Sequence, residues 1–152
     1  MELRPVQPED LRSIIQLRHA AFLQRAPEFY SAREVENLLN DYNKAELLQM
    51  IEDQCLFLYE ENGQILGTSG WKSENIRHIY VKPGLMGQGL GRKLLIHAET
   101  DYKKRTRNDH IYAGVILYAK GFYEKNGYQV VRREKAWDGS EYYFMRKDLG
   151  LD

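Results

Sequence analysis

The glycine-rich stretch GLMGQGLGRKLL, at residues 84–95, constrains the fold more than any other part of the sequence. It follows a β-type run at 76–81 and leads into leucines at helical spacing. A glycine-rich turn between a strand and a helix presents several unpaired backbone N–H groups, and the helix dipole adds about half a positive charge at the same point. The stretch therefore favours an anion-binding turn, typically one for phosphate.

Two familiar glycine patterns do not fit this turn. The loop of nucleoside triphosphatases requires Lys and Ser/Thr after its last glycine, whereas Leu90 and Gly91 follow Gly89. The dinucleotide fingerprint requires a glycine at the position of Arg92. A G-x-G-x-G turn remains, at Gly87, Gly89 and Gly91. Close packing of a strand against a helix is the alternative explanation for these glycines.

Composition indicates one ordinary domain. The chain has 152 residues, 43% of them hydrophobic, and no repeat or linker interrupts it, so we predict a single domain over residues 1–152. Basic and acidic residues balance at 22 each, which argues against nucleic acid as a partner. The basic run at 103–107 is interpreted as a solvated helix end.

The single cysteine and the termini give expectations about location. Cys55 lies in an apolar run and has no second cysteine to pair with, so we predict a buried thiol and no metal site. Charge and proline within the first five residues argue against a signal peptide, and no apolar run reaches membrane-spanning length. We expect a cytoplasmic protein with no membrane partner.

The order of predicted elements indicates an α/β domain. A hairpin is predicted at Asn62-Gly63, and a helix is predicted to start with the capping box of Ser31 and Glu34. In the helix after the glycines, Glu99 is placed with the polar residues. Strands are expected at residues 1–6, 55–59, 65–71, 76–81, 110–117, 128–133 and 140–147. Helices are expected to begin near residues 8, 31, 43, 90 and 120.

Several stretches together resemble the GNAT superfamily of N-acetyltransferases. IYVKPGLMGQGLGRKLL is similar to its acetyl-CoA-binding motif, and AKGFYEKNGY to its later motif with Phe-Tyr and a Gly-aromatic pair. The opening ELRPVQPEDLRSIIQL and the closing EYYFMRKDL resemble the first strand and helix and the last strand of the family. The resemblance covers essentially the whole chain.

The resemblance implies a fold and an activity. The fold is α/β (α+β), with a mixed and mostly antiparallel central sheet of about six or seven strands flanked by helices, and a splayed fourth and fifth strand pair. The activity is transfer of the acetyl group of acetyl-CoA to a primary amine of a small molecule or protein, by direct attack in a ternary complex and without a metal. The resemblance also raises the expectation of a homodimer, but the sequence does not identify an interface for one.

The resemblance assigns cofactor contacts residue by residue. Met86 stands where the family motif has Arg or Gln, and Ile116 stands where many members have asparagine. The main chain at Ile79 to Val81 is expected to contact the pantetheine arm. The implied cofactor-binding residues are Ile79, Tyr80, Val81, Met86, Gly87, Gln88, Gly89, Leu90, Gly91, Arg92, Ala119 and Tyr123.

Catalytic and acceptor-binding candidates follow from the same comparison. Tyr123 falls on the general-acid tyrosine of the family and is expected to assist the departing thiolate. The usual positions of the base hold Arg77 and Asn75, neither of which is a base at neutral pH. Histidines ordinarily titrate near pH 6.5, so His78 is the preferred candidate if a β-bulge turns it toward the site; a structural histidine is the alternative. Arg77 and Tyr30 are the candidate substrate contacts.

A second function remains open at this point. A non-catalytic acyl-CoA-binding module would keep the cleft without turnover. Met86 and the missing base on the strand favour that interpretation, whereas Tyr123 argues against it.

Overall fold

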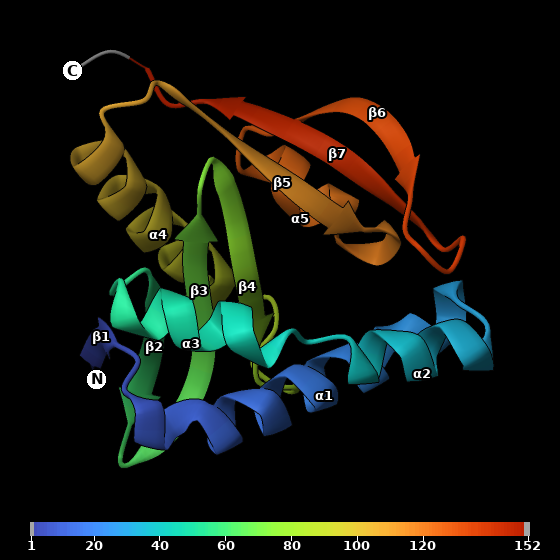
Figure 1. The fold of residues 1–152 in the computed structure, drawn as a ribbon, viewed down its shortest axis with the longest axis horizontal. Helices are drawn as coiled ribbons and strands as arrows, with labels where there is room; N and C mark the ends of the chain where they lie inside the picture. The colour runs from blue at the N-terminus through green and yellow to red at the C-terminus, as the bar shows by residue number, and fades with distance from the viewer. Residues whose placement is uncertain (1, 151–152) are drawn as a thin grey trace.

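The computed structural model describes residues 2–150 and has one seven-stranded sheet in the order β1-β2-β3-β4-β5-β7-β6 (Figure 1). All neighbouring strands are antiparallel except β4 and β5, which are parallel. The strands are β1 (Glu2–Pro5), β2 (Leu56–Glu61), β3 (Gln64–Lys72), β4 (Asn75–Val81), β5 (His110–Ile116), β6 (Gln129–Lys135) and β7 (Glu141–Asp148). The predicted mixed, mostly antiparallel sheet is confirmed.

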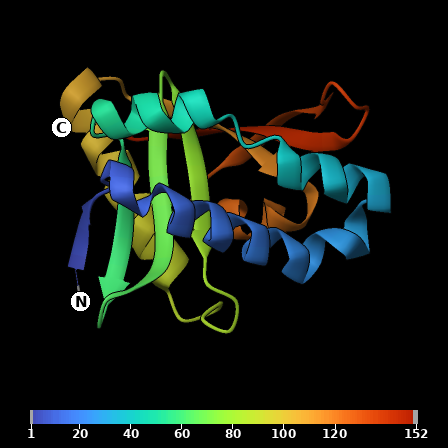
Figure 2. The same ribbon diagram turned by 60° about the horizontal axis from the view of Figure 1, so that its bottom comes forward.

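Helices cover both faces of this sheet. Figure 2 shows α1 and α3 in front of the central strands and α4 behind them, and α5 lies beside β5 (Figure 1). The helices are α1 (Leu11–Phe29), α2 (Ala32–Asn40), α3 (Lys44–Glu52), α4 (Leu90–Thr106) and α5 (Lys120–Lys125), with single 3-10 turns at Pro8–Asp10 and Leu117–Ala119. No helix within residues 2–150 is both long enough and apolar enough to span a membrane.

Local sequence signals act as predicted at two turns. Asn62 and Gly63 both have positive φ angles, 53° and 76°, which is the conformation that a two-residue hairpin requires between β2 and β3. At the start of α2, the Ser31 hydroxyl accepts from the Glu34 N–H, and the Glu34 carboxylate accepts from the Ser31 N–H. This reciprocal pair satisfies two backbone donors that the helix would otherwise leave free.

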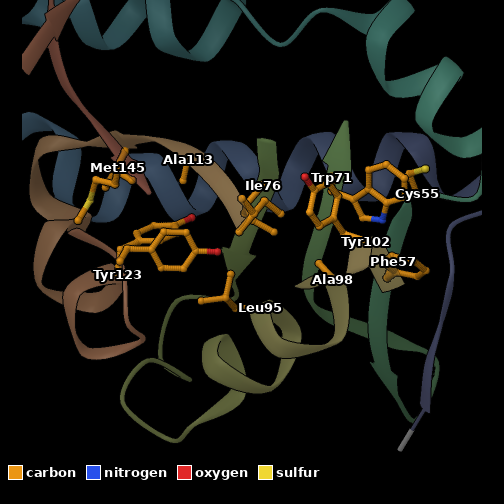
Figure 3. Close-up of a cluster of buried hydrophobic side chains, with 13 residues drawn as sticks. Cys55, Phe57, Trp71, Ile76, Leu95, Ala98, Tyr102, Ala113, Tyr123 and Met145 are labelled. Atoms are coloured by element: carbon orange, nitrogen blue, oxygen red, sulfur yellow. The ribbon is translucent and has the colours of Figure 1, made fainter. Parts of the chain in front are cut away.

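Strand alternation divides the core into layers. In β2, Leu56 and Leu58 face the cluster that α1 and α3 complete, whereas Phe57 and Tyr59 face α4. The α4 layer extends across the sheet to β7 and forms the largest cluster (Figure 3). Cys55 belongs to this cluster and is buried, as predicted.

Gly67 of β3 sits where no side chain fits. A Cβ at this position would lie 2.5 Å from Leu94 Cδ1 and 2.9 Å from the carbonyl oxygen of Tyr80. The leucine could rotate, but the Tyr80 carbonyl belongs to the neighbouring strand. The glycine therefore lets α4 approach β3 and β4 closely.

We predict that Gly67→Ala lowers the free energy of unfolding by about 1–3 kcal/mol, because overpacking forces the backbone of β4 to shift. Urea denaturation measures this loss. Gly121→Ala is the matched control, since a Cβ there meets no atom within 4 Å. Equal losses in the two variants would contradict the steric explanation.

Candidate active site

The parallel strands β4 and β5 separate almost as soon as they meet. Only Asn75 pairs with Tyr112 and Ile76 with Ala113, after which the two strands diverge (Figure 1). A cleft of about 1040 Å³ opens at this separation. Its walls come from α1, the α2–α3 corner, β4, the glycine turn, β5, α5 and β7. The splayed strand pair expected from the resemblance is therefore present.

The glycine turn forms one end of the cleft. Gly84, Gly87 and Gly89 have φ angles of 92°, 80° and 82°, a region that other residues rarely adopt. Gly89 is the N-cap of α4, and no side chain caps this helix, so its first N–H groups remain available to a ligand. A Cβ at Gly91 would lie 3.1 Å from the Phe122 ring, so this glycine also serves close packing.

Most of the predicted cofactor contacts line the cleft. Gln88 and Leu90 are the two that do not line the cleft. Met86 lines it but is 54% exposed. The remaining members of the predicted set that line it are Ile79, Tyr80, Val81, Met86, Gly87, Gly89, Gly91, Arg92, Ala119 and Tyr123.

Tyr123 of α5 lines the middle of the cleft and is only 9% exposed. Its ring meets the rings of Phe122 and Tyr128 edge to face, each with centroids 5.2 Å apart. Burial raises the pKa of Tyr123, so the hydroxyl is protonated at neutral pH. Within residues 2–150, no protein group hydrogen bonds to this hydroxyl, which leaves its proton available to a ligand.

A buried polar network supports Tyr123 from behind. The Tyr128 hydroxyl donates to Glu99 at 2.6 Å, and the Lys147 ammonium lies 2.9 Å from the other oxygen of that carboxylate. Burial, followed by the charge of Glu99, raises the pKa of Tyr128. Glu99 was predicted to lie on the polar side of the helix, and this prediction is wrong, because its side chain is 6% exposed. Its partners are on other elements, so helical spacing could not identify them.

His78 lies at a β-bulge in β4. Thr68 pairs with Tyr80 and Gly70 with Arg77, so His78 and Ile79 together oppose one residue of β3. His78 has a φ of 59°, and its carbonyl accepts from the Thr68 hydroxyl at 2.7 Å. The bulge that the sequence analysis required for His78 is therefore present, and the imidazole lines the cleft.

Glu46 of α3 is the charged neighbour of His78. Its Oε1 lies 3.8 Å from His78 Nε2 and 3.7 Å from Arg77 Nε. The nearby imidazole, and then Arg77, hold the pKa of Glu46 below its usual range in spite of burial. Glu46 was not among the residues predicted for the site. It lies in the first turn of α3, where its N–H donates to the Asn43 side chain.

The two predicted substrate contacts differ in position. Arg77 lines the cleft and its side chain is 46% exposed. Tyr30 does not line it and has a structural role instead. Its buried hydroxyl donates to the Glu141 carbonyl at 2.8 Å and accepts from the Leu117 N–H at 3.0 Å, which ties α1 to β7 and to the turn after β5.

The sequence profile of the Acetyltransferase (GNAT) domain matches residues 27–149. The chain belongs to the GNAT acetyltransferase family. Its glycine turn and Tyr123, the residues that carry the family motifs, both line the cleft. No curated protein sequence matches the chain significantly.

Solved GNAT structures share this fold over nearly the whole chain. A GCN5-related N-acetyltransferase from Rhodopseudomonas palustris has a TM-score of 0.88 at 23% identity, covering 97% of this chain and 95% of the other. PaiA N-acetyltransferase from Thermoplasma acidophilum, in complex with coenzyme A, has a TM-score of 0.76 at 22% identity, covering 97% and 98%. The ribosomal-protein-S18-alanine N-acetyltransferase from Escherichia coli has a TM-score of 0.69 at 17% identity, covering 99% and 95%.

We predict that Lys147→Met lowers the free energy of unfolding by about 3 kcal/mol, because it leaves the Glu99 carboxylate buried without its cation. Chemical denaturation measures the loss. The double variant Glu99→Gln with Lys147→Met should recover much of it, since a neutral amide still accepts from Tyr128. A single variant as stable as the unaltered protein would contradict the pairing.

Proposed function

We propose that this protein is an acetyl-CoA-dependent N-acetyltransferase acting on a primary amine of a small molecule or a protein. One observation carries the proposal: a single cleft joins the uncapped N-terminus of α4 to a protonated tyrosine, Tyr123, and to an imidazole, His78. Acetyl transfer needs these three functions together, namely anion binding, a donor for the leaving thiolate and a base for the amine.

The glycine turn fits the diphosphate of coenzyme A. The free N–H groups at the start of α4, the positive φ angles of Gly87 and Gly89 and the nearby Arg92 all favour an anion there. Coenzyme A is the bound ligand in the structural relative from T. acidophilum. Along β4, the main chain from Ile79 to Val81 borders the gap toward β5 and offers amide partners for a pantetheine arm. Acetyl-CoA supplies the acetyl group as a thioester.

Tyr123 donates a hydrogen bond to the sulfur as the C–S bond breaks. Reference pKa values of about 10 for tyrosine and 8.5 for a thiol make complete proton transfer uphill by about 2 kcal/mol. Burial raises the pKa of Tyr123 further and widens this gap. The hydroxyl therefore stabilises the thiolate as a hydrogen-bond donor.

His78 accepts the proton that the amine loses. The bulge turns its ring into the cleft, and the neighbouring Glu46 carboxylate stabilises the imidazolium that forms. Arg77, which lines the same cleft with a partly exposed side chain, pairs with a carboxylate of the acceptor.

A non-catalytic acyl-CoA-binding module is the second candidate. The observation that favours it is Met86, an exposed apolar side chain at the turn where the family motif places Arg or Gln. Such a module would bind coenzyme A without turnover.

We predict that acetyl-CoA raises the melting temperature by several degrees at about 100 times its Kd, whereas ATP and NAD do not. Binding at the turn requires the pantetheine arm as well as phosphate, which accounts for the selectivity. A thermal unfolding series with the three ligands measures this. Equal shifts with all three would contradict a coenzyme A site.

We predict that Tyr123→Phe lowers kcat by about 10²-fold or more and leaves coenzyme A affinity unchanged, because only the thiolate donor is lost. Thiol release measures turnover with a panel of a polyamine, an aminoglycoside, free amino acids and a peptide with a free N-terminus. Tyr59→Phe, on β2 outside the cleft, is the matched control. Transfer to no amine by the unaltered protein, with normal binding, would favour the binding module.

A further inference from the structure

Three polar side chains lie around His78, and only one of them, Glu46, has been given a role so far. They are Glu46 on α3, Tyr80 on β4 and Arg18 on α1, and all of them line the cleft. Tyr80 was predicted to contact the cofactor only through its main chain. Its side chain lies on the other side of the strand, against α1, where its ring meets Phe22 edge to face with centroids 5.5 Å apart.

The two ring nitrogens of His78 face different partners. Nε2 lies 3.8 Å from Glu46 Oε1, and Nδ1 lies 3.5 Å from the Tyr80 hydroxyl. Nε2 is buried, and no group among the described residues hydrogen bonds to it in this geometry. Contacts between catalytic groups are often long without substrate and shorten when it binds.

The carboxylate decides the tautomer of the neutral ring. Glu46 is ionised at neutral pH because the pKa of its carboxyl is lowered, so the nitrogen beside it, Nε2, carries the hydrogen. Nδ1 is then the free base, and the group in front of Nδ1 is the Tyr80 hydroxyl. An amine in the cleft therefore reaches the basic nitrogen of His78 through Tyr80.

We propose that Tyr80, His78 and Glu46 form a proton relay for the acceptor amine, an inference that rests on the proposed N-acetyltransferase function. As the amine nitrogen bonds to the acetyl carbon, its proton passes to the Tyr80 oxygen, and the Tyr80 proton passes to His78 Nδ1. The N–H bonding electrons stay on the nitrogen, and the C–S electrons leave with the thiolate at Tyr123. Tyr80 ends neutral, and the imidazolium is paired with Glu46.

The charges around the relay favour this direction of transfer. Burial raises the pKa of Tyr80, so its hydroxyl holds a proton before the reaction, and the positive charges of Arg18 and Arg77 oppose the rise. These cations stabilise the tyrosine oxygen while its proton is moving. Lys72, at the end of β3, adds a further positive charge near Glu46.

Arg18 is held in a fixed position near the Tyr80 oxygen that its charge stabilises. Its side chain is 5% exposed, and its guanidinium donates to the carbonyls of Leu38, Leu39 and Asp41 at the end of α2. It also lies over the Phe22 ring, 4.6 Å from the centroid. Arginine stays protonated in proteins, so this buried guanidinium keeps its positive charge near Tyr80. Among the described residues, no carboxylate forms an ion pair with it.

The test compares Tyr80→Phe and Glu46→Gln with matched controls outside the cleft, Tyr59→Phe and Glu52→Gln. For each protein, kcat/KM is measured against pH with the best amine of the panel, coenzyme A affinity is measured by calorimetry, and the His78 ring is titrated by NMR. Tyr80→Phe should lower kcat/KM by about 10²-fold with unchanged coenzyme A affinity. Both controls should match the unaltered protein.

Glu46→Gln gives the second readout. Without the carboxylate, the imidazolium is less stable, so the NMR midpoint of His78 and the acid limb of kcat/KM should both move to lower pH, and by the same amount. Full activity in Tyr80→Phe, or an acid limb that stays in place while the NMR midpoint moves, would overturn the relay. Those results would overturn the relay but not the proposed acetyltransferase function. Absence of acetyl transfer by the unaltered protein would overturn both.

Discussion

The cleft exists because β4 and β5 stop pairing after two residue pairs, and the proposed site depends on this separation. Two residue pairs join the parallel strands, and the sheet continues on both sides through antiparallel ladders, of which the one between β3 and β4 contains a bulge. Backbone groups that lose a ladder partner must find another one. The bulge at His78 bends β4 at the separation, and the Thr68 hydroxyl holds the carbonyl that the bulge exposes. The gap is thus built into the fold, and the edge of β4 along it offers free main-chain groups.

Polar groups are buried on both sides of this gap, and each set serves one half of the proposed reaction. Behind α5, Glu99 and Lys147 fix Tyr128 against Tyr123, the donor for the leaving thiolate. Across the cleft, Glu46 and Tyr80 flank His78, the acceptor for the amine proton. Burying ionised groups costs free energy unless they are paired, so their concentration here is a sign of function.

The sequence predicted what local signals determine. Helix caps, the Asn62-Gly63 hairpin and the glycine turn depend on residues within a few positions of one another, and the motif spacing placed Tyr123 in the cleft. Contacts between distant elements were not predictable in this way. Glu99 has the spacing of a surface residue on α4, but Lys147 and Tyr128 bury it. Tyr30 was predicted to contact the substrate, but its hydroxyl joins α1 to β7.

The most direct test of this account is a crystal structure of the protein with coenzyme A. We predict that the diphosphate lies on the N–H groups of the Gly87–Gly91 turn, that the pantetheine amides pair with the free edge of β4, and that the thiol points toward the Tyr123 hydroxyl. Coenzyme A bound outside the gap, or a gap closed by pairing of β4 with β5, would contradict the central claim that the splayed strands form the acetyl-transfer site.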